Sequence, residues 1–440
     1  MIKTSEYLSD VVRLWQEWVT LPLRARLSRF TRLTRRQSER FFVSLDPRDQ
    51  VGLLREVPQA EQRALMRLLA PDALADLLQN APSKERLQLF GLLDENSVSE
   101  VRALLAYAED EAGGLMNPRF LQVAPEMSVG DAIDHVRRQT STIECIYYVY
   151  VLEQDRQLLG VLSLRNLLST GSARLIGEIM RSDVVSVPET LDQEAVARLW
   201  REYDLLALPV VDALGRIKGI ITYDDIADVL REEATEDSHK FAGMAALEMQ
   251  YLATPLRELI TKRGGWLGLL FLGELLTASA MAYYQADIGA AVVLALFIPL
   301  IISSGGNSGS QASTLVIRSM ALGELRLVDW WRVLRREIAV GLALGLLLAG
   351  LGLLRIVVWQ AAGGMYGEHY LLLGATVALS LVGVVLWGSL MGALLPFALR
   401  RVGLDPASAS APLVATLVDV TGLIIYFTMA QFVLRGTLLP

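Results

Sequence analysis

The chain has 440 residues, of which 52% are hydrophobic, and a formal net charge of −7. This acidic balance excludes a nucleic-acid-binding surface, which needs a basic stripe. Cys145 is the single cysteine, so the chain forms no internal disulfide. The three histidines, His135, His239 and His369, are too far apart for the spacing of a zinc site.

Charged residues are frequent up to about Arg263 and scarce from Trp266 onward, where Leu, Val, Ala and Gly dominate. We therefore predict a polar, globular half followed by a membrane half. The opening segment MIKTSEYLSDVVRLWQEW lacks the apolar core and the small-residue cleavage site of a signal peptide. We accordingly expect the polar half to lie in the cytoplasm.

The first part of the chain, residues 1–111, is predicted to be an all-α domain. Its first stretch contains RARLSRFTRLTRRQSER and has the pattern of a basic helix. Such a helix either docks on a membrane or a partner, or is simply solvated. Short apolar patterns with helical spacing follow, separated by Pro47, Pro58, Pro71 and Pro82. Because each pattern is too short to be stable alone, we expect a stacked helical array.

An internal repeat of about sixty residues comes next. The first copy (112–176) holds GGLMNPRFLQVAPEMSVGDAI and IYYVYVLEQDRQLLGVLSLRNLL, and the second (177–237) holds RSDVVSVPETLDQEAV and LALPVVDALGRIKGIITYDDIADVL. Each copy has the order helix, strand, helix, strand, turn, strand, helix. The arrangement resembles a tandem pair of CBS domains, an α/β regulatory module.

Residues 238–265 connect the two halves and include Pro255, which suits the first turn of a helix. Five candidate membrane spans follow, at residues 266–284, 288–303, 338–359, 371–399 and 407–434. Lys and Arg occur in alternate connections, which predicts an inside N-terminus and an outside C-terminus.

Asp419 is the acid in the middle of the last predicted span. An ionised group at mid-bilayer costs about 2.5–3.5 kcal/mol, so it normally faces a cavity or a partner. It either makes a helix–helix hydrogen bond or forms an ion site in a pore. Thr416 and Thr421 flank it, and Pro412 and Gly422 are predicted to interrupt the helix.

In this prediction, Pro412 leaves the carbonyl of Ser408 without its helical N–H donor. Carbonyls and hydroxyls near Pro412, Ala415 and Thr416 would then supply oxygen ligands for a hard, largely hydrated cation such as Mg²⁺.

The stretch GGNSGSQAST, residues 305–314, is a second signal in the membrane half. Its glycines and small polar residues predict irregular backbone, which at membrane depth lines water or is buried in protein. A plain cytoplasmic turn is the alternative. The stretch is not a phosphate loop, because it lacks the Lys and follows a span.

Acidic residues form a third signal, in the polar half. Asp72 and Asp76 are four apart and share one helical face. The others of interest are Asp192, Glu194, Asp204, Asp224, Asp225, Asp228, Glu232, Glu233, Glu236 and Asp237. Each could simply belong to a solvated helix face, but the group at the end of the second repeat leads toward the membrane half.

Several strings together resemble the MgtE family of magnesium channels: EDEAGGLM, IYYVYV, EEATEDSHK, GGNSGSQASTLVIR, GALLPFALRRVGLDPA and PLVATLVDVTG. The resemblance implies a helical N domain, tandem CBS domains, a connecting plug helix (238–265) and a five-helix transmembrane domain (266–440). It also implies a homodimer with its pore on the two-fold axis and Asp419 as the pore acid. The family often has Asn where this chain has Ala411.

The resemblance further implies that cytosolic Mg²⁺ holds the pore shut by bridging acidic surfaces. We call the predicted metal-ligating acids of the polar half the sensor acids; they are Asp72, Asp76, Asp192, Glu194, Asp204, Asp225, Asp228, Glu233 and Glu236.

Thr222 and Asp225 match positions that hold a nucleotide ribose in many CBS domains, and Ser163 and Asn166 are the weaker equivalents. The predicted ligands are therefore Mg²⁺ and, at the second CBS copy, ATP.

The sequence thus predicts a homodimeric, multi-pass Mg²⁺ channel of the cytoplasmic membrane, in contact with lipid and not with nucleic acid. No nucleophile–base pair is evident, so we predict no enzyme. An ion-coupled transporter of Mg²⁺ or Co²⁺ and a CBS-based Mg²⁺ sensor without transport remain alternatives. Selectivity among Mg²⁺, Co²⁺, Mn²⁺ and Zn²⁺ is left open.

Overall fold

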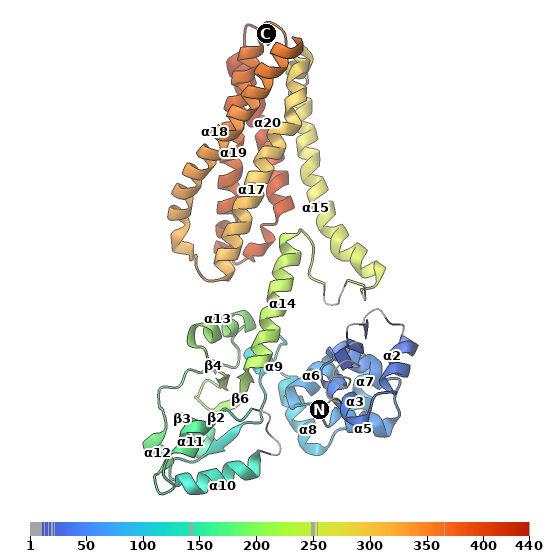
Figure 1. Ribbon diagram of the computed structural model, residues 1–440, viewed down its shortest axis with the longest axis vertical. Helices are drawn as coiled ribbons and strands as arrows, with labels where there is room; N and C mark the ends of the chain where they lie inside the picture. The colour runs from blue at the N-terminus through green and yellow to red at the C-terminus, as the bar shows by residue number, and fades with distance from the viewer. Residues whose placement is uncertain are drawn as a thin grey trace, which may run out of the picture. The chain divides into compact units, whose positions relative to one another are not determined.

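The computed structural model describes residues 11–439 except 13, 16, 19, 20, 22, 141, 142, 144, 248–250, 253 and 365. Its internal contacts divide the chain into two compact units, Met1–Glu233 and Ala234–Pro440 (Figure 1). The first unit holds a helical array and two small sheets, and the second holds long apolar helices. The predicted fold class is confirmed.

Short helices form the start of the first unit. They are α2 (Leu23–Phe30), α3 (Arg35–Val43), α4 (Pro47–Leu54), α5 (Gln59–Met66), α6 (Pro71–Gln79), α7 (Ser83–Phe90) and α8 (Glu95–Leu104). The prolines that separate the predicted helices all lie at helix starts, at the first turn of α4 and α6 and at the N-caps of α5 and α7. Proline fits the first turn because N–H groups there have no intrahelical acceptor.

Two copies of one α/β pattern follow. The first contains α9 (Ala112–Leu115), β1 (Leu121–Val123), α10 (Val129–Gln139), β2 (Tyr148–Leu152), η1 (Gln154–Arg156), β3 (Leu158–Ser163) and α11 (Leu164–Ser169). The second contains α12 (Ile176–Ile179), β4 (Val187–Pro188), α13 (Gln193–Tyr203), β5 (Ala207–Val211), β6 (Ile217–Thr222) and α14 (Tyr223–Phe241).

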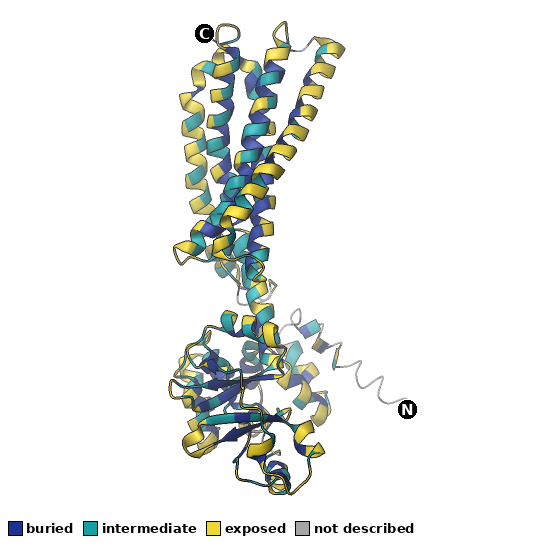
Figure 2. Ribbon diagram, turned by 90° about the vertical axis from the view of Figure 1, so that its left-hand side faces the viewer, coloured by how far each residue is buried: buried dark blue, intermediate teal, exposed yellow. Residues whose placement is uncertain are grey.

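The two copies have the same sheet topology. In each, the first strand runs parallel to the second and the second antiparallel to the third. Both copies also shift register at the same place, between Val151 and Leu152 and between Val210 and Val211. The middle strands β2 and β5 are mostly buried (Figure 2). A shared topology and a shared irregularity confirm the predicted repeat.

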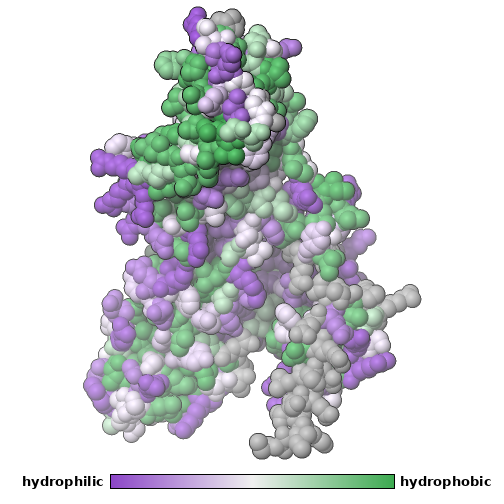
Figure 3. Space-filling model, turned by 45° about the horizontal axis from the view of Figure 1, so that its top comes forward, coloured by the Kyte–Doolittle hydropathy of each residue, from purple (hydrophilic) through white to green (hydrophobic). Residues whose placement is uncertain are grey.

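The second unit is built from long helices. They are α15 (Leu256–Tyr283), α16 (Gln285–Ala290), η2 (Val292–Phe297), α17 (Ile298–Ala321), η3 (Leu327–Asp329), α18 (Trp330–Gly363), α19 (Tyr370–Arg401), η4 (Pro406–Ser408) and α20 (Ala411–Leu434). Five segments of the described chain are long and apolar enough to cross a membrane: Leu256–Tyr283, Val292–Ala321, Leu327–Gly363, Tyr370–Arg401 and Ala411–Leu434. Hydrophobic side chains gather on the surface of this unit (Figure 3). The prediction of five spans is confirmed.

The predicted irregular backbone at residues 305–314 is wrong, because the whole stretch is helical within α17. Its glycines let α17 and α19 approach closely instead. A Cβ at Gly309 would lie 2.9 Å from the carbonyl oxygen of Gly388, and a Cβ at Gly392 would collide with the carbonyl oxygen of Gly309. Close packing of this kind is typical of small residues in membrane helices, and it outweighs the low helix propensity of glycine.

The predicted interruption of the last span is also wrong, since α20 is continuous. Pro412 lies in its first turn, where a missing N–H costs nothing, so it frees no carbonyl of Ser408 within the helix. The Ser410 side chain caps this end of the helix, and Gly422 is an ordinary helical residue.

The segment predicted as a connecting helix, residues 238–265, is divided in the structure. Its first residues end α14, the described residues between 242 and 255 are outside helices, and α15 begins at Leu256. Pro255 is the N-cap of α15. The chain therefore enters the first span as part of one long helix that starts after a non-helical stretch.

Candidate ion pathway and metal-sensing acids

Asp419 lies near the middle of α20 and is half-buried. Its carboxyl group lies close to that of Glu274 of α15. The two helices approach closely at this level because Gly273 faces Thr416, and a Cβ at Gly273 would collide with the Thr416 side chain. Two acids from different spans therefore meet at one place.

Glu274 is absent from the residues predicted from the sequence. A signal for it exists, because Glu274 and Asp419 are the two acids within the five predicted spans. An acid in an apolar span costs free energy unless it faces a cavity or a partner. The sequence alone does not show which spans are neighbours, and this is why the pair could not be identified.

Helix α17 also packs against α20, close to Asp419. A Cβ at Gly306 would lie 3.5 Å from the Ala415 Cβ and 4.0 Å from Oδ1 of Asp419. Toward the start of α20, the Ser313 hydroxyl donates to the carbonyl oxygen of Ala409 at 2.8 Å. The structure thus brings together the glycine-rich stretch and Asp419, the two signals found in the membrane half.

The two threonines that flank Asp419 differ in their surroundings. The Thr421 hydroxyl accepts from the indole N–H of Trp387 at 2.8 Å and donates to the carbonyl oxygen of Leu417 at 2.7 Å. The hydrogen bonds of the Thr421 hydroxyl therefore serve to hold helices together. Thr416 is buried at the contact with α15 and stays a predicted ligand, as does Ala415.

Asp76 of α6 lies in the electrostatic field of Asp225, although the two residues are far apart in the sequence. Burial raises the pKa of Asp76 to about 7, and the negative charges of Asp225, Glu109 and Glu232 add to the shift. Protein atoms surround the Asp76 carboxyl, but its side chain keeps contact with solvent, which screens part of this repulsion. Burial also raises the pKa of Asp225 to about 6, although hydrogen bonds from Thr222 oppose the shift.

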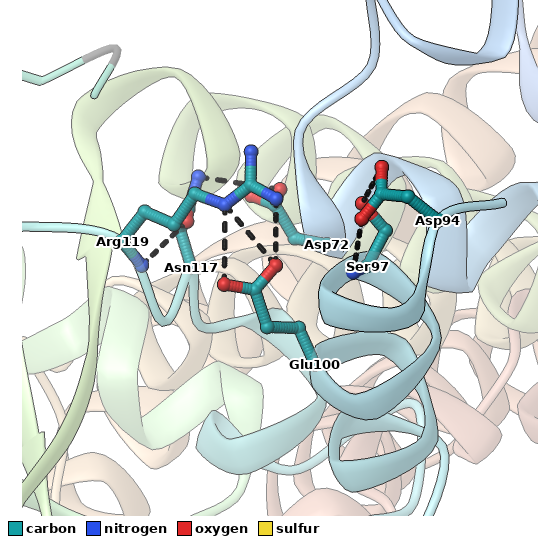
Figure 4. A network of polar contacts seen from close by, with 6 residues as sticks. All are labelled: Asp72, Asp94, Ser97, Glu100, Asn117 and Arg119. Atoms are coloured by element: carbon teal, nitrogen blue, oxygen red, sulfur yellow. Dashed lines mark hydrogen bonds and ion pairs between the residues drawn. The ribbon is translucent and has the colours of Figure 1, made fainter. Parts of the chain in front are cut away.

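Asp72 belongs to a separate polar network (Figure 4). Its carboxyl accepts from the Asn117 side chain at 3.4 Å. The Asn117 side-chain oxygen in turn accepts from the backbone N–H of Arg119 at 2.9 Å. Arg119 forms a bidentate ion pair with Glu100 of α8, at 2.6 Å for the shortest contact. The loop before β1 thereby joins α6 to α8.

The other sensor acids of the first unit have local partners. Asp192 caps α13, accepting from the backbone N–H of Glu194 at 3.0 Å, and Asp204 ends the same helix in a left-handed conformation. The remaining pairs are Glu194 with Arg198 (3.9 Å), Asp228 with Arg231 (2.6 Å) and Glu233 with Gln193 (2.7 Å).

Among the described residues, no group of three or more His, Cys, Asp or Glu side chains is placed to hold a metal ion. The sensor acids as a set therefore stay a prediction. Exposed pairs of this kind contribute only about 0–1 kcal/mol, so a dication could displace them.

Lys240, near the end of α14, links the last sensor acid to the membrane helices. Its ammonium group lies 2.5 Å from a carboxyl oxygen of Glu236 and 2.6 Å from one of Asp405. The two carboxylates outweigh partial burial and hold the pKa of Lys240 above its usual value. Asp405 caps the short helix η4 that precedes α20, so this ion-pair bridge ends next to the helix that carries Asp419.

The predicted nucleotide residues lie at the junction of β6 and α14. The Asp225 carboxyl accepts from the backbone N–H of Thr222 at 3.0 Å and from its hydroxyl at 2.5 Å. In the first copy, the Ser163 side chain accepts from the backbone N–H of Asn166 at 3.1 Å. Asp225 thus takes part in a helix cap, and its charge also acts on Asp76.

Family models match most of the chain. The MgtE intracellular N domain matches residues 9–110, the CBS domain matches 112–172 and 176–232, and MgtE, a divalent cation transporter, matches 298–429. Together with the five spans, these matches define a multi-pass membrane protein of the divalent-cation transporter class that carries a CBS pair.

The relatives specify the family. The chain is 40% identical over 430 residues to the magnesium transporter MgtE of Thermus thermophilus, covering 97% of this chain and 93% of that protein. It is 32% identical to the magnesium transporter MgtE of Bacillus subtilis, covering 87% and 82%. The chain belongs to the MgtE family of magnesium transporters, which are transporters and not enzymes.

One similar solved structure is the cytosolic domain of the Mg²⁺ channel MgtE in complex with ATP, at 38% identity and a TM-score of 0.48. The match covers 50% of this chain and 90% of that one.

Proposed function

We propose that this protein is a Mg²⁺-selective channel that admits magnesium across the cytoplasmic membrane. The proximity of Glu274 and Asp419 in two membrane spans supports this proposal most directly. Two adjacent carboxyl groups repel each other when ionised, and a dication between them relieves that repulsion. Because Mg²⁺ dehydrates reluctantly and keeps several waters, one or two carboxylates and nearby oxygens suit its passage better than a closed cage.

The proposal includes a homodimer and an orientation. A second copy across the pore would double the number of carboxyl groups near the ion. We assign the basic residues Lys262, Arg263, Arg400 and Arg401 to one side of the membrane. Since basic residues favour the cytoplasmic side, they support an N-terminal unit in the cytoplasm and a C-terminus outside.

Closure by internal Mg²⁺ is the regulatory part of the proposal. Asp76 and Asp225 repel each other across α6 and α14, and a bound dication would hold them together. A site filled only in the closed state, at tenfold excess of ion over Kd, contributes about 1.4 kcal/mol. Moving a gate from 1:99 to 99:1 takes about 5.5 kcal/mol, so roughly four weak sites suffice.

Contacts in the second unit provide a route from α14 to the pore helices. Lys240 reaches Asp405 before α20. Gly243 follows, with a left-handed φ of 73°, and a Cβ there would lie 3.1 Å from Cγ of Pro412 and would press on the Trp266 indole. Gly243, just after α14, therefore packs directly against the start of α20 and against Trp266 of α15.

Thr222 and Asp225 are proposed to hold the ribose of ATP as well. The same carboxylate would then serve Mg²⁺ and nucleotide, so the two ligands would influence each other's binding.

Ion flux into liposomes tests the function. The purified protein is reconstituted, and influx of Mg²⁺, Co²⁺, Mn²⁺ and Zn²⁺ is compared with and without Mg²⁺ on the cytoplasmic face. A channel for Mg²⁺ gives fast Mg²⁺ influx that internal Mg²⁺ suppresses. Influx that requires a Na⁺ or H⁺ gradient would instead identify a coupled transporter, and no influx of any dication would leave only a sensor.

A further inference from the structure

A cavity of about 200 Å³ lies at the edge of the first CBS copy. It is formed where the loop before β1, the end of α10 and the turn between β2 and β3 meet. The polar side chains in its lining are Arg119, Gln122, Gln139 and Arg156. None of them belongs to the ion pathway, the sensor acids or the predicted nucleotide residues.

Arg156 is a cation without an acidic partner in the described part of the chain. Its guanidinium carbon lies 5.4 Å from the ring centroid of Phe120, a cation–π contact. Burial lowers the pKa of Arg156, which indicates that its charge is partly removed from water. Asp155 and Arg156 both have left-handed φ values, 67° and 64°, and strain of this kind tends to occur at functional sites.

Arg119 contributes a second guanidinium to the same cavity. Its Nε and Nη2 atoms bind Glu100, at 3.1 and 2.6 Å, whereas Nη1 has no hydrogen-bond partner among the described residues (Figure 4). Because Glu100 balances the charge of Arg119, the cavity carries the uncompensated charge of Arg156. It therefore combines one net positive charge with several N–H donors.

We propose that this cavity binds a phosphate group, either as the free ion or as part of a small phosphate compound. Guanidinium groups match the oxygens of phosphate in geometry and charge, and the amide of Gln122 can supply a further donor. The volume is below the about 300–1,000 Å³ of sites that enclose drug-sized ligands. A phosphate fits inside, and any larger remainder of the ligand stays outside.

We expect phosphate binding in this cavity to change the affinity of Asp72 for Mg²⁺. The backbone of Arg119 holds the Asn117 side chain, which donates to Asp72. Phosphate and Mg²⁺ would then change each other's affinity by the same factor, as linkage requires. This coupling rests on the proposed function of Asp72, whereas phosphate binding itself does not.

Titration calorimetry of the full chain in detergent micelles, with inorganic phosphate at constant ionic strength, tests the site. Arg156→Gln is expected to weaken phosphate binding at least about tenfold, and Arg156→Lys to recover part of the loss. Arg138→Gln is the control, because Arg138 is exposed on α10 outside the cavity. Thermal unfolding verifies that each variant is folded.

Equal phosphate affinity in the wild type and Arg156→Gln, or no phosphate binding by the wild type, overturns the proposal. Parallel titrations with pyrophosphate and ATP identify the source: loss of ATP binding in Arg156→Gln indicates a nucleotide phosphate, and unchanged ATP binding indicates the free ion. Asn117→Ala should leave phosphate binding intact and abolish its effect on Mg²⁺ affinity. Absence of Mg²⁺ flux would contradict the proposed channel without affecting these titrations.

Discussion

Asp419 lies close to Glu274, and in the proposed channel this pair of carboxyl groups would distinguish ions by their charge. A monovalent cation is balanced by one carboxylate, whereas a dication gains from two. Attraction between opposite charges grows in a medium of low dielectric constant, so the second carboxylate matters most for the more highly charged ion. Glu274 is therefore expected to set the preference for dications over monovalent ions.

Glu274→Gln is predicted to lower Mg²⁺ influx about tenfold or more, the equivalent of losing about 1.4 kcal/mol. The ratio of Mg²⁺ to Na⁺ permeability should fall with it, and Glu274→Asp should recover part of both. Glu324→Gln, at an exposed position after α17, is the matched control. A Glu274→Gln protein with wild-type influx and wild-type selectivity would show that the second carboxylate has no role in permeation.

Asp76 and Asp225 predict a pH dependence. Their pKa values in the folded protein, about 7 and about 6, lie above the ordinary value of 3.8. Between these limits the folded state binds more protons than the unfolded state, so stability falls as pH rises. The contribution is fully present below about pH 4 and is lost as pH passes 6 to 7.

Thermal unfolding with a chelator present is expected to show a lower melting temperature at about pH 8 than at about pH 5. Added Mg²⁺ should reverse the difference, and Asp76→Asn should flatten it. Asp183→Asn, which replaces an exposed acid, should leave the wild-type pH profile unchanged. A wild-type melting temperature that is the same at both pH values would contradict the proposed repulsion.

At the level of helices, α17 and α19 pack through glycine. Gly392→Ala places a methyl group against the carbonyl oxygen of Gly309, and overpacking of this kind costs about 1–3 kcal/mol. Gly350→Ala in α18 is the control, because nothing lies within 4 Å of a Cβ there. Denaturant unfolding in micelles should show a clear loss of stability for the first variant and none for the second; equal stability would mean that the helices do not approach as described.

The ion pair between Lys240 of α14 and Asp405 is predicted to transmit closure of the pore by internal Mg²⁺. Lys240→Met and Asp405→Asn should each raise, several-fold, the internal Mg²⁺ concentration that half-closes the pore. Because Lys240→Met already removes the ion pair with Asp405, as well as that with Glu236, the double variant should differ little from Lys240→Met alone. Lys84→Met, at an exposed position of α7, provides the control; additive effects of the two substitutions would argue that the ion pair carries no coupling.

Over the whole molecule, the features set by local patterns could be predicted from the sequence. The order of helices and strands along the repeat follows from its local patterns, and the five spans follow from apolar length. Pro47 and Pro71, predicted to separate helices, lie in the first turns of α4 and α6. Asp419 could be found because a charge in an apolar span is conspicuous.

The features set by tertiary neighbours could not be predicted. The stretch at 305–314 is helical only because its glycines pack on α19. Glu274 gains its role from the approach of α15 to α20, and Asp76 from the meeting of α6 with α14. Each depends on contacts between segments far apart in the chain, which one sequence does not reveal.

Mg²⁺ influx into liposomes that contain either the wild type or Asp419→Asn, at equal protein density and with folding verified by thermal unfolding, tests the channel most directly. We predict rapid wild-type influx that Mg²⁺ on the cytoplasmic face suppresses, and influx at the level of empty liposomes for Asp419→Asn. Wild-type influx through Asp419→Asn would show that magnesium does not pass by this carboxylate.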